Sequence, residues 1–180
     1  MTWSSFIYSL GADPNFKDGL KQTIGFYVAR DGKVKVMDYL LAQGCSFTDI
    51  DSYLQTPLYY AARDGRTEMV KRLIELGNNP NHLDMNHQTC LFYAAKNGHL
   101  ETVKLLIENG AKHDITDNKK QTALHYAKKS NNPQLIEYLT ALKNPKAAAK
   151  DKDKQKDKEK ETVKEKDKEK AKENEKKADD

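Results

Sequence analysis

Two histidines and a cysteine lie close together near the middle of the chain, where their spacing could suggest a metal site. His82, His87 and Cys90 fall within one short stretch. A zinc ion in a structural site takes four such ligands in compact, paired spacings, and one cysteine with two loop histidines is an incomplete set. We interpret these residues as polar loop residues. His99, His113 and His125 need no ligand either, and we expect no metal and no other cofactor.

Catalytic patterns are missing from the sequence. It contains no Gly-rich phosphate loop, no nucleophile elbow and no paired carboxylates in a pocket-forming pattern. We therefore predict that the chain is not an enzyme.

Four cations recur at an interval of 33 residues, namely Arg30, Arg63, Lys96 and Lys129. In stacked units they would form a ladder with steps of roughly 10 Å, the packing distance of neighbouring helices. Such a ladder suits an acidic or phosphorylated segment of a partner protein, with Arg63 and Lys96 at its centre. The alternative is a solvated polar face, since Asp31 and Asp64 follow the first two cations and partly neutralise them.

A ladder of tyrosines precedes the cations by three residues, at Tyr27, Tyr60, Tyr93 and Tyr126. One interpretation is an aromatic floor that stacks on a side chain or cages a methylated lysine. The other is packing between units with the hydroxyl reaching water. We favour packing.

The elements that position these ladders are repeated pairs of short helices. Gln22, Gln55, Gln88 and Gln121 are 33 residues apart, and each is followed by threonine. In the stretch 88–110, Thr89 is expected to cap a first helix that stops near Asn97, and a second helix runs from Leu100 to Gly110. Helices this short are marginal alone in water, so repetition must supply their stability.

The other units vary this plan. The second unit has Thr56 as N-cap, Pro57 at the first helical position and a second helix over 67–76. The first unit, with a second helix over 34–43, has Gly25 where later units have leucine, which predicts lost apolar burial and a weaker helix. The fourth unit, 121–142, carries Lys128 in place of alanine, as suits an end of the array.

An aspartate recurs in the connector ahead of each unit, at Asp18, Asp51, Asp84 and Asp117. A carboxylate at such a position can accept backbone N–H bonds and hold a turn. We predict a structural role for all four.

The pattern D-x-x-x-x-T-P-L-x-x-A-A-x-x-G-x-x-x-x-V-x-x-L-I-x-x-G resembles the ankyrin repeat, over about four fifths of the chain. The resemblance implies an all-α, ankyrin-type helical repeat solenoid with hairpin-like connectors. The chain departs from the family in two ways. The usual glycine before Gln-Thr is replaced by Lys21, Leu54, His87 and Lys120. The histidine that would bond the threonine hydroxyl survives only as His125, with Phe26, Tyr59 and Phe92 elsewhere.

The resemblance also implies a function. Ankyrin-like folds bind partner proteins on a concave face lined by connector tips and first helices, so we expect a protein–protein interaction module, a scaffold or adaptor. The alternative is a targeting or regulatory segment of a larger enzyme. Carried over by position, the partner-binding residues are Tyr53, Gln55, Arg63, Met85, Asn86, Gln88, Tyr93, Lys96, Lys119 and Lys129.

Three segments are expected: an N-terminal half unit at 1–17, four repeats at 18–145 and a tail at 146–180. Trp3 to Leu10 would be a second helix without its first, either an end cap or the trace of a longer protein. The tail alternates 14 lysines with 12 acidic residues. Its near lack of apolar residues predicts a disordered polyampholyte, with a partly helical stretch as the alternative.

Composition limits the remaining partners. The net charge of +4 is shared between tail and repeats, so nucleic-acid binding is disfavoured. No segment approaches the roughly 18 apolar residues of a membrane span. Cys45 and Cys90 are the only cysteines and occupy different places in their units. We expect a monomeric protein without membrane insertion, in the reducing cytoplasm or nucleus.

Overall fold

The computed structural model describes residues 13–143, and over that range the chain forms α-helices joined by long connectors. The helices are α2 (Ile24–Asp31), α3 (Val34–Ala42), α4 (Pro57–Arg63), α5 (Thr67–Glu75), α6 (Cys90–Lys96), α7 (Leu100–Glu108), α8 (Ala123–Ala127) and α9 (Pro133–Lys143). The predicted half unit at Trp3–Leu10 and the predicted disordered tail lie outside the described residues, and the segment boundaries stay predictions.

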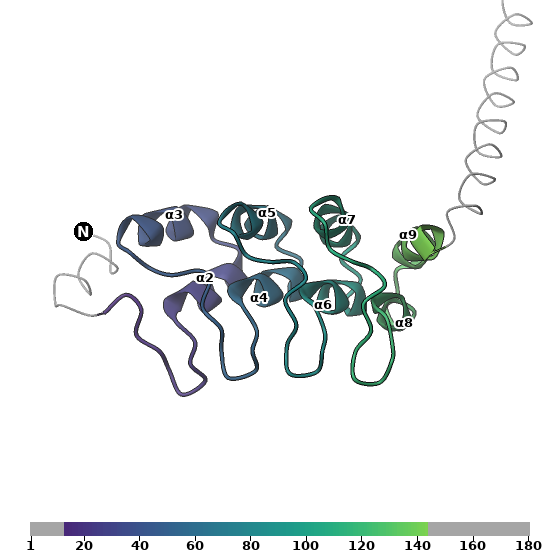
Figure 1. Ribbon diagram of the computed structural model, residues 1–180. Helices are drawn as coiled ribbons and strands as arrows, with labels where there is room; N and C mark the ends of the chain where they lie inside the picture. Colours follow the sequence, from purple (N-terminus) through teal and green to yellow (C-terminus); the bar gives the residue numbers. More distant parts are fainter. Residues whose placement is uncertain (1–12, 144–180) are drawn as a thin grey trace, which may run out of the picture. The chain divides into compact units, whose positions relative to one another are not determined.

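The helices form four pairs, one per unit: α2–α3, α4–α5, α6–α7 and α8–α9. First helices pack in a row, α2 on α4, α4 on α6 and α6 on α8, while α5 packs against both α3 and α7. The connectors leave this row as long loops on the side away from the second helices (Figure 1). The predicted all-α repeat fold is confirmed.

Buried apolar side chains from both rows form one core. Leu58 and Leu91 of the first helices are fully buried, as are Leu73 and Leu106 of the second helices. Alanines at the ends of α4 and α6 are also fully buried, which lets neighbouring first helices approach closely. Because no single pair could bury this surface alone, stacking stabilises every unit.

The threonines that precede the first helices do not cap them with their side chains. Thr56 and Thr89 occupy the predicted N-cap positions in an extended conformation, but neither hydroxyl makes a capping hydrogen bond. These hydroxyls and that of Thr23 are buried without a hydrogen-bond partner. The predicted side-chain cap is therefore wrong. Aromatic residues replace the family's histidine in these three units, so no imidazole is present to pair with the hydroxyl.

In the second unit, two constraints favour glycine in the turn between the helices: its positive φ and the close approach of a side chain from the next unit. Gly65 has a φ of 66°, and a Cβ there would lie 2.6 Å from Nδ1 of His99 in the next unit. The other imidazole nitrogen, Nε2, lies 2.9 Å from the carbonyl oxygen of Arg63. His99 thus joins the second and third units, as its predicted structural role requires.

The first unit repacks around Gly25. A Cβ at Gly25 would lie 2.7 Å from the carbonyl oxygen of Ser46 and 3.3 Å from the ring of Phe47. Phe47 is 2% exposed and stands where later units have Pro80 and His113. The predicted loss of apolar burial is therefore wrong, because the Phe47 side chain fills the space that a leucine occupies in the later units.

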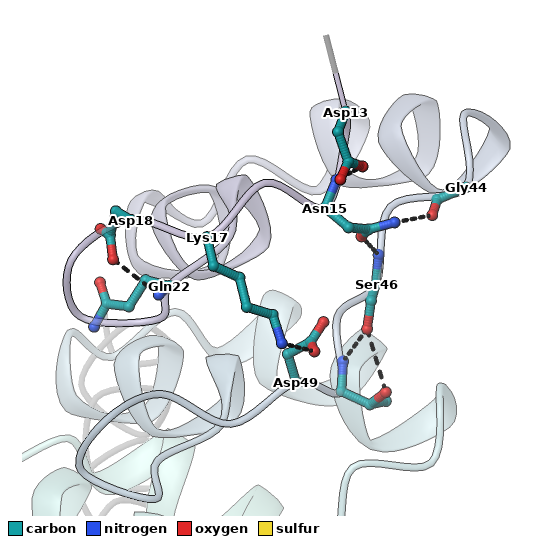
Figure 2. Close-up of polar contacts among 9 residues, drawn as sticks. Asp13, Asn15, Lys17, Asp18, Gln22, Gly44, Ser46 and Asp49 are labelled. Carbon is teal, nitrogen blue, oxygen red and sulfur yellow. Dashed lines mark hydrogen bonds and ion pairs between the residues drawn. The ribbon is translucent and has the colours of Figure 1, made fainter.

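Side chains also join consecutive connectors. Asn15 donates to the carbonyl oxygen of Gly44 at 2.9 Å and accepts from the Ser46 amide at 2.7 Å (Figure 2). Lys17 pairs with Asp49 across the same junction at 2.8 Å. Asn81 repeats the asparagine clamp on Gly110 and Lys112, two units further along. Connectors of successive units are thus fixed to one another rather than hanging independently.

Candidate functional site

An aspartate at the base of each connector holds the connector's tip by its backbone. In the third unit, Oδ1 of Asp84 accepts from the amides of Asn86 and Gln88 at 2.8 and 2.9 Å. Asp18, Asp51 and Asp117 make the same pair of bonds in their own units. The predicted structural role of these carboxylates is confirmed.

The second carboxylate oxygen links neighbouring units. Oδ2 of Asp84 accepts from Nε2 of Gln55 in the preceding unit at 3.0 Å and from the Tyr93 hydroxyl at 2.5 Å. Gln55 also donates to the Tyr93 hydroxyl at 2.8 Å. The same triangle recurs as Gln22–Asp51–Tyr60 and as Gln88–Asp117–Tyr126. We call each triangle an Asp–Gln–Tyr network.

Ionisation in these networks follows from burial and hydrogen bonding. Burial, and then the bond to its aspartate, raises the pKa of both Tyr60 and Tyr93, so these hydroxyls stay protonated donors. Burial alone would raise the pKa of Asp117. Its hydrogen bonds, foremost that from Tyr126, outweigh burial and lower that pKa to about 2. The networks are therefore neutral donors arranged around a carboxylate.

The tyrosine ladder belongs to this frame. The rings of Tyr60, Tyr93 and Tyr126 pack edge-on against Phe26, Tyr59 and Phe92 of the preceding unit, with centroids 5.7 to 5.8 Å apart. Three of the four ladder tyrosines also carry the cation of their own unit over the ring, at 5.2, 5.0 and 5.5 Å for Arg30, Arg63 and Lys129. This geometry supports packing between units.

The cation ladder divides into two halves. Arg30 and Arg63 each pair with the aspartate that follows them, with Nε–Oδ1 distances of 3.3 and 2.8 Å. Lys96 and Lys129 are exposed and are followed by Asn97 and Ser130, which carry no charge. Within residues 13–143 neither lysine has an ion pair. Of the four cations in this ladder, only those of the last two units therefore lack an ion pair within residues 13–143.

The three residues between each aspartate and glutamine form the tip of a connector: 19–21, 52–54, 85–87 and 118–120. All twelve tip residues are exposed. The third residue of every tip has a positive φ between 56° and 61°, at Lys21, Leu54, His87 and Lys120. Backbone bonds join adjacent tips, such as Met85 N to Tyr53 O at 3.2 Å. The tips therefore form a continuous, fixed row.

The predicted binding residues separate into two groups. Tyr53, Met85, Asn86, Lys96, Lys119 and Lys129 are exposed, whereas Gln55, Arg63, Gln88 and Tyr93 are half-buried. The two glutamines and Tyr93 hold the network together, and Arg63 is paired with Asp64. Gln88 and Tyr93 are therefore part of the frame between units as well as predicted binding residues. Participation of all ten residues in partner binding stays a prediction.

Sequence reasoning missed two features of this face. The predicted set omits the third residue of each tip, yet Leu54 and Lys120 are exposed. Sequence reasoning also assigned glutamine to the surface, although the constant interval of 29 residues from each Gln to the next unit's Asp could have indicated a pair.

The residues that suggested a metal have other contacts. His82 Nε2 lies 2.8 Å from the carbonyl oxygen of Leu54, and His87 lies in a tip. Cys90 is fully buried, and burial raises the pKa of its thiol to about 12. Within residues 13–143, no three His, Cys, Asp or Glu side chains are grouped so that they could hold a metal ion.

Stacked helix pairs with tip-bearing connectors define a helical repeat protein of the solenoid class. The family model described as ankyrin repeats (three copies) matches residues 4–84 and 72–154. The chain belongs to the ankyrin-repeat family. Ankyrin repeats generally mediate protein–protein interaction and are typically non-catalytic. No curated protein sequence matches the chain. None of the helices between residues 13 and 143 has the length and apolar character needed to cross a membrane.

Proposed function

We propose that the chain is a scaffold or adaptor without catalytic activity, which binds a segment of a partner protein along the row of tips and the adjoining ends of the first helices. The observation that carries this proposal is a contrast in chemistry. The network beneath the tips keeps the same three residue types between units, whereas the tips read GLK, SYL, MNH and NKK. A rigid frame that presents different exposed side chains is suited to specific recognition.

The partner segment is proposed to be acidic or phosphorylated where it meets the last two units. Lys96, Lys119 and Lys129 are exposed and form no ion pair with a carboxylate of residues 13–143, so phosphate or carboxylate groups could bind them without displacing an internal partner there. Binding by a single copy in the cytoplasm or nucleus is part of the same proposal, and a Cys90 thiol without a disulfide is compatible with those reducing compartments.

Site-specific photo-crosslinking in the native cell tests the proposed face. A photoreactive phenylalanine analogue placed at Tyr53 is expected to crosslink a protein that the same analogue at Met85 also captures. Tyr39 on α3 provides the control, because its 40% exposure is similar to the 50% exposure of Tyr53 and it lies on a second helix. Equal capture of the same protein from position 39 would contradict binding at the tips.

A further inference from the structure

We propose that the partner segment is bipartite, with an apolar cluster that contacts the tips of the first three units and an acidic cluster that contacts lysines of the last two. This inference rests on the proposed function, because it assumes that the tip row is the binding face. It goes beyond that function by assigning the two parts of the segment to different units.

The apolar half of the face is continuous. Leu20, Tyr53, Leu54 and Met85 are 44%, 50%, 44% and 58% exposed. They lie on three successive tips that backbone bonds hold together, from Ser52 N to Leu20 O at 2.9 Å and from Met85 N to Tyr53 O at 3.2 Å. Large apolar side chains gathered on a fixed row, rather than scattered singly, are typical of an interaction surface. The only exposed cation in these three tips is Lys21.

The basic half begins in the third unit. Lys96 at the end of α6, Lys119 and Lys120 in the fourth tip, and Lys129 after α8 are all exposed. The nearby carboxylate of Asp117 is buried and accepts four hydrogen bonds from neutral donors, and it forms no ion pair with a lysine of residues 13–143. Tyr126 places tip and helix end on one face, since its hydroxyl bonds Asp117 while Lys129 lies over its ring.

The interval between the two halves sets the spacing of the partner. Tyr53 and Lys119 are two units apart, which corresponds to roughly 20 Å at the packing distance of neighbouring helices. An extended chain covers that distance in about six residues, at about 3.3 Å each. The chain's own tail is a poor occupant, because residues 146–180 contain no aromatic residue, leucine, isoleucine or methionine and interleave both charges. Exposed apolar tips also disfavour a nucleic-acid backbone as the main ligand.

Selection from a display library of random 16-residue peptides on the full chain tests the inference. We expect enriched peptides to carry apolar and acidic clusters about six residues apart. The best peptide is then measured by fluorescence anisotropy. Its affinity should fall about tenfold for Tyr53→Ser/Met85→Ser and about tenfold for Lys96→Gln/Lys119→Gln. The matched control Lys35→Gln/Lys71→Gln removes two exposed lysines of the second helices and should leave affinity unchanged.

Each outcome decides between the two proposals. Enriched peptides that respond to Tyr53→Ser/Met85→Ser but carry no acidic cluster overturn the bipartite segment and leave the tip row as the binding face. Peptides whose affinity neither face variant changes overturn the tip row itself, as does a library with no enrichment. A 16-nucleotide oligothymidine that binds as tightly as the best peptide, through the same lysines, replaces the acidic peptide with a nucleic acid.

Discussion

The first and third units build the same structure by different means. In the third unit Leu91 fills the core, and Asp84 is buried and bonded to Gln55 of the preceding unit. In the first unit Gly25 and Phe47 fill the corresponding space, and Asp18 is only half-buried. Both aspartates nevertheless hold their tips by accepting the same two hydrogen bonds from backbone amides.

This difference distinguishes contacts made within one unit from contacts that a unit makes with its neighbours. The hydrogen bonds that shape a tip occur in every unit, because each joins an aspartate to a backbone amide no more than four residues further along the same connector. The bonds that use Gln and the packing that uses Leu depend on neighbours, and they vary where the surroundings vary. Variants that act on local bonds should behave alike in the two units, and variants that act on neighbours should not.

The largest expected effect is on the repacked core of the first unit. Phe47→Ala removes a ring that is 2% exposed and leaves a cavity beside Gly25, which should cost about 3 kcal/mol of unfolding free energy. Denaturant unfolding followed by circular dichroism measures the loss. Phe16→Ala, just ahead of the first unit, is the control, because that ring is 73% exposed and its removal should change stability by no more than about 0.5 kcal/mol.

A second variant tests whether Phe47 stands in for the missing leucine. Gly25→Leu alone should destabilise the unit, because its Cβ would lie 2.7 Å from the carbonyl oxygen of Ser46 and 3.3 Å from the Phe47 ring, and only the second contact is removed by Phe47→Ala. Combined with Phe47→Ala, it should recover part of the loss. A double variant that is merely the sum of the two single variants would show that the positions do not share one space.

The next effect compares the networks of the two units directly. Asp84→Ala leaves two tip amides, Gln55 and the Tyr93 hydroxyl without their buried acceptor, and about 3 kcal/mol should be lost. Asp18→Ala removes the same tip bonds from a half-buried site where water replaces the carboxylate, so its effect should be clearly smaller. Thermal unfolding of both variants, side by side, gives the comparison. Equal shifts would show that the link to the preceding unit contributes little.

The sequence predicts the frame well because the frame is periodic. The 33-residue spacing of Thr, Ala, Gly and Asp is enough for the helix pairs, the left-handed turn glycines and the carboxylates that hold the tips. It fails at positions where two distant residues must be considered together. Neither Gly25 with Phe47 nor Gln55 with Asp84 can be recognised as a pair without knowing how consecutive units stack.

The candidate site was predictable as a row of tips, but its contents were not. Tyr53, Met85 and Lys119 are exposed as expected, because connector tips have little core to contact. The sequence offers Gln88 and Tyr93 as binding residues by position alone. Only the geometry shows that they bind a buried carboxylate of an adjacent or the same unit.

The smallest expected effect concerns the third tip residue, which has a positive φ in both the first and the third unit. Lys21 and His87 have φ of 61° and 56°, where a non-glycine side chain costs about 1 kcal/mol. Glycine removes that cost but adds backbone freedom to the unfolded chain, so Lys21→Gly and His87→Gly should each stabilise by about 0.5 kcal/mol. Denaturant unfolding of both variants checks that the two gains are the same within error.

Asn86→Gly is the matched control for this last comparison. Asn86 is an exposed tip residue next to His87, and it is not among the residues with positive φ in the described chain. Glycine there relieves no strain, increases the freedom of the unfolded state and removes the hydrogen-bond interaction of the Asn86 side chain with Tyr93, so it should destabilise. A gain at position 86 equal to that at position 87 would mean that loss of the side chains, rather than relief of backbone strain, explains the effect. The positive φ of the third tip residue would then not be a shared source of strain in the two units.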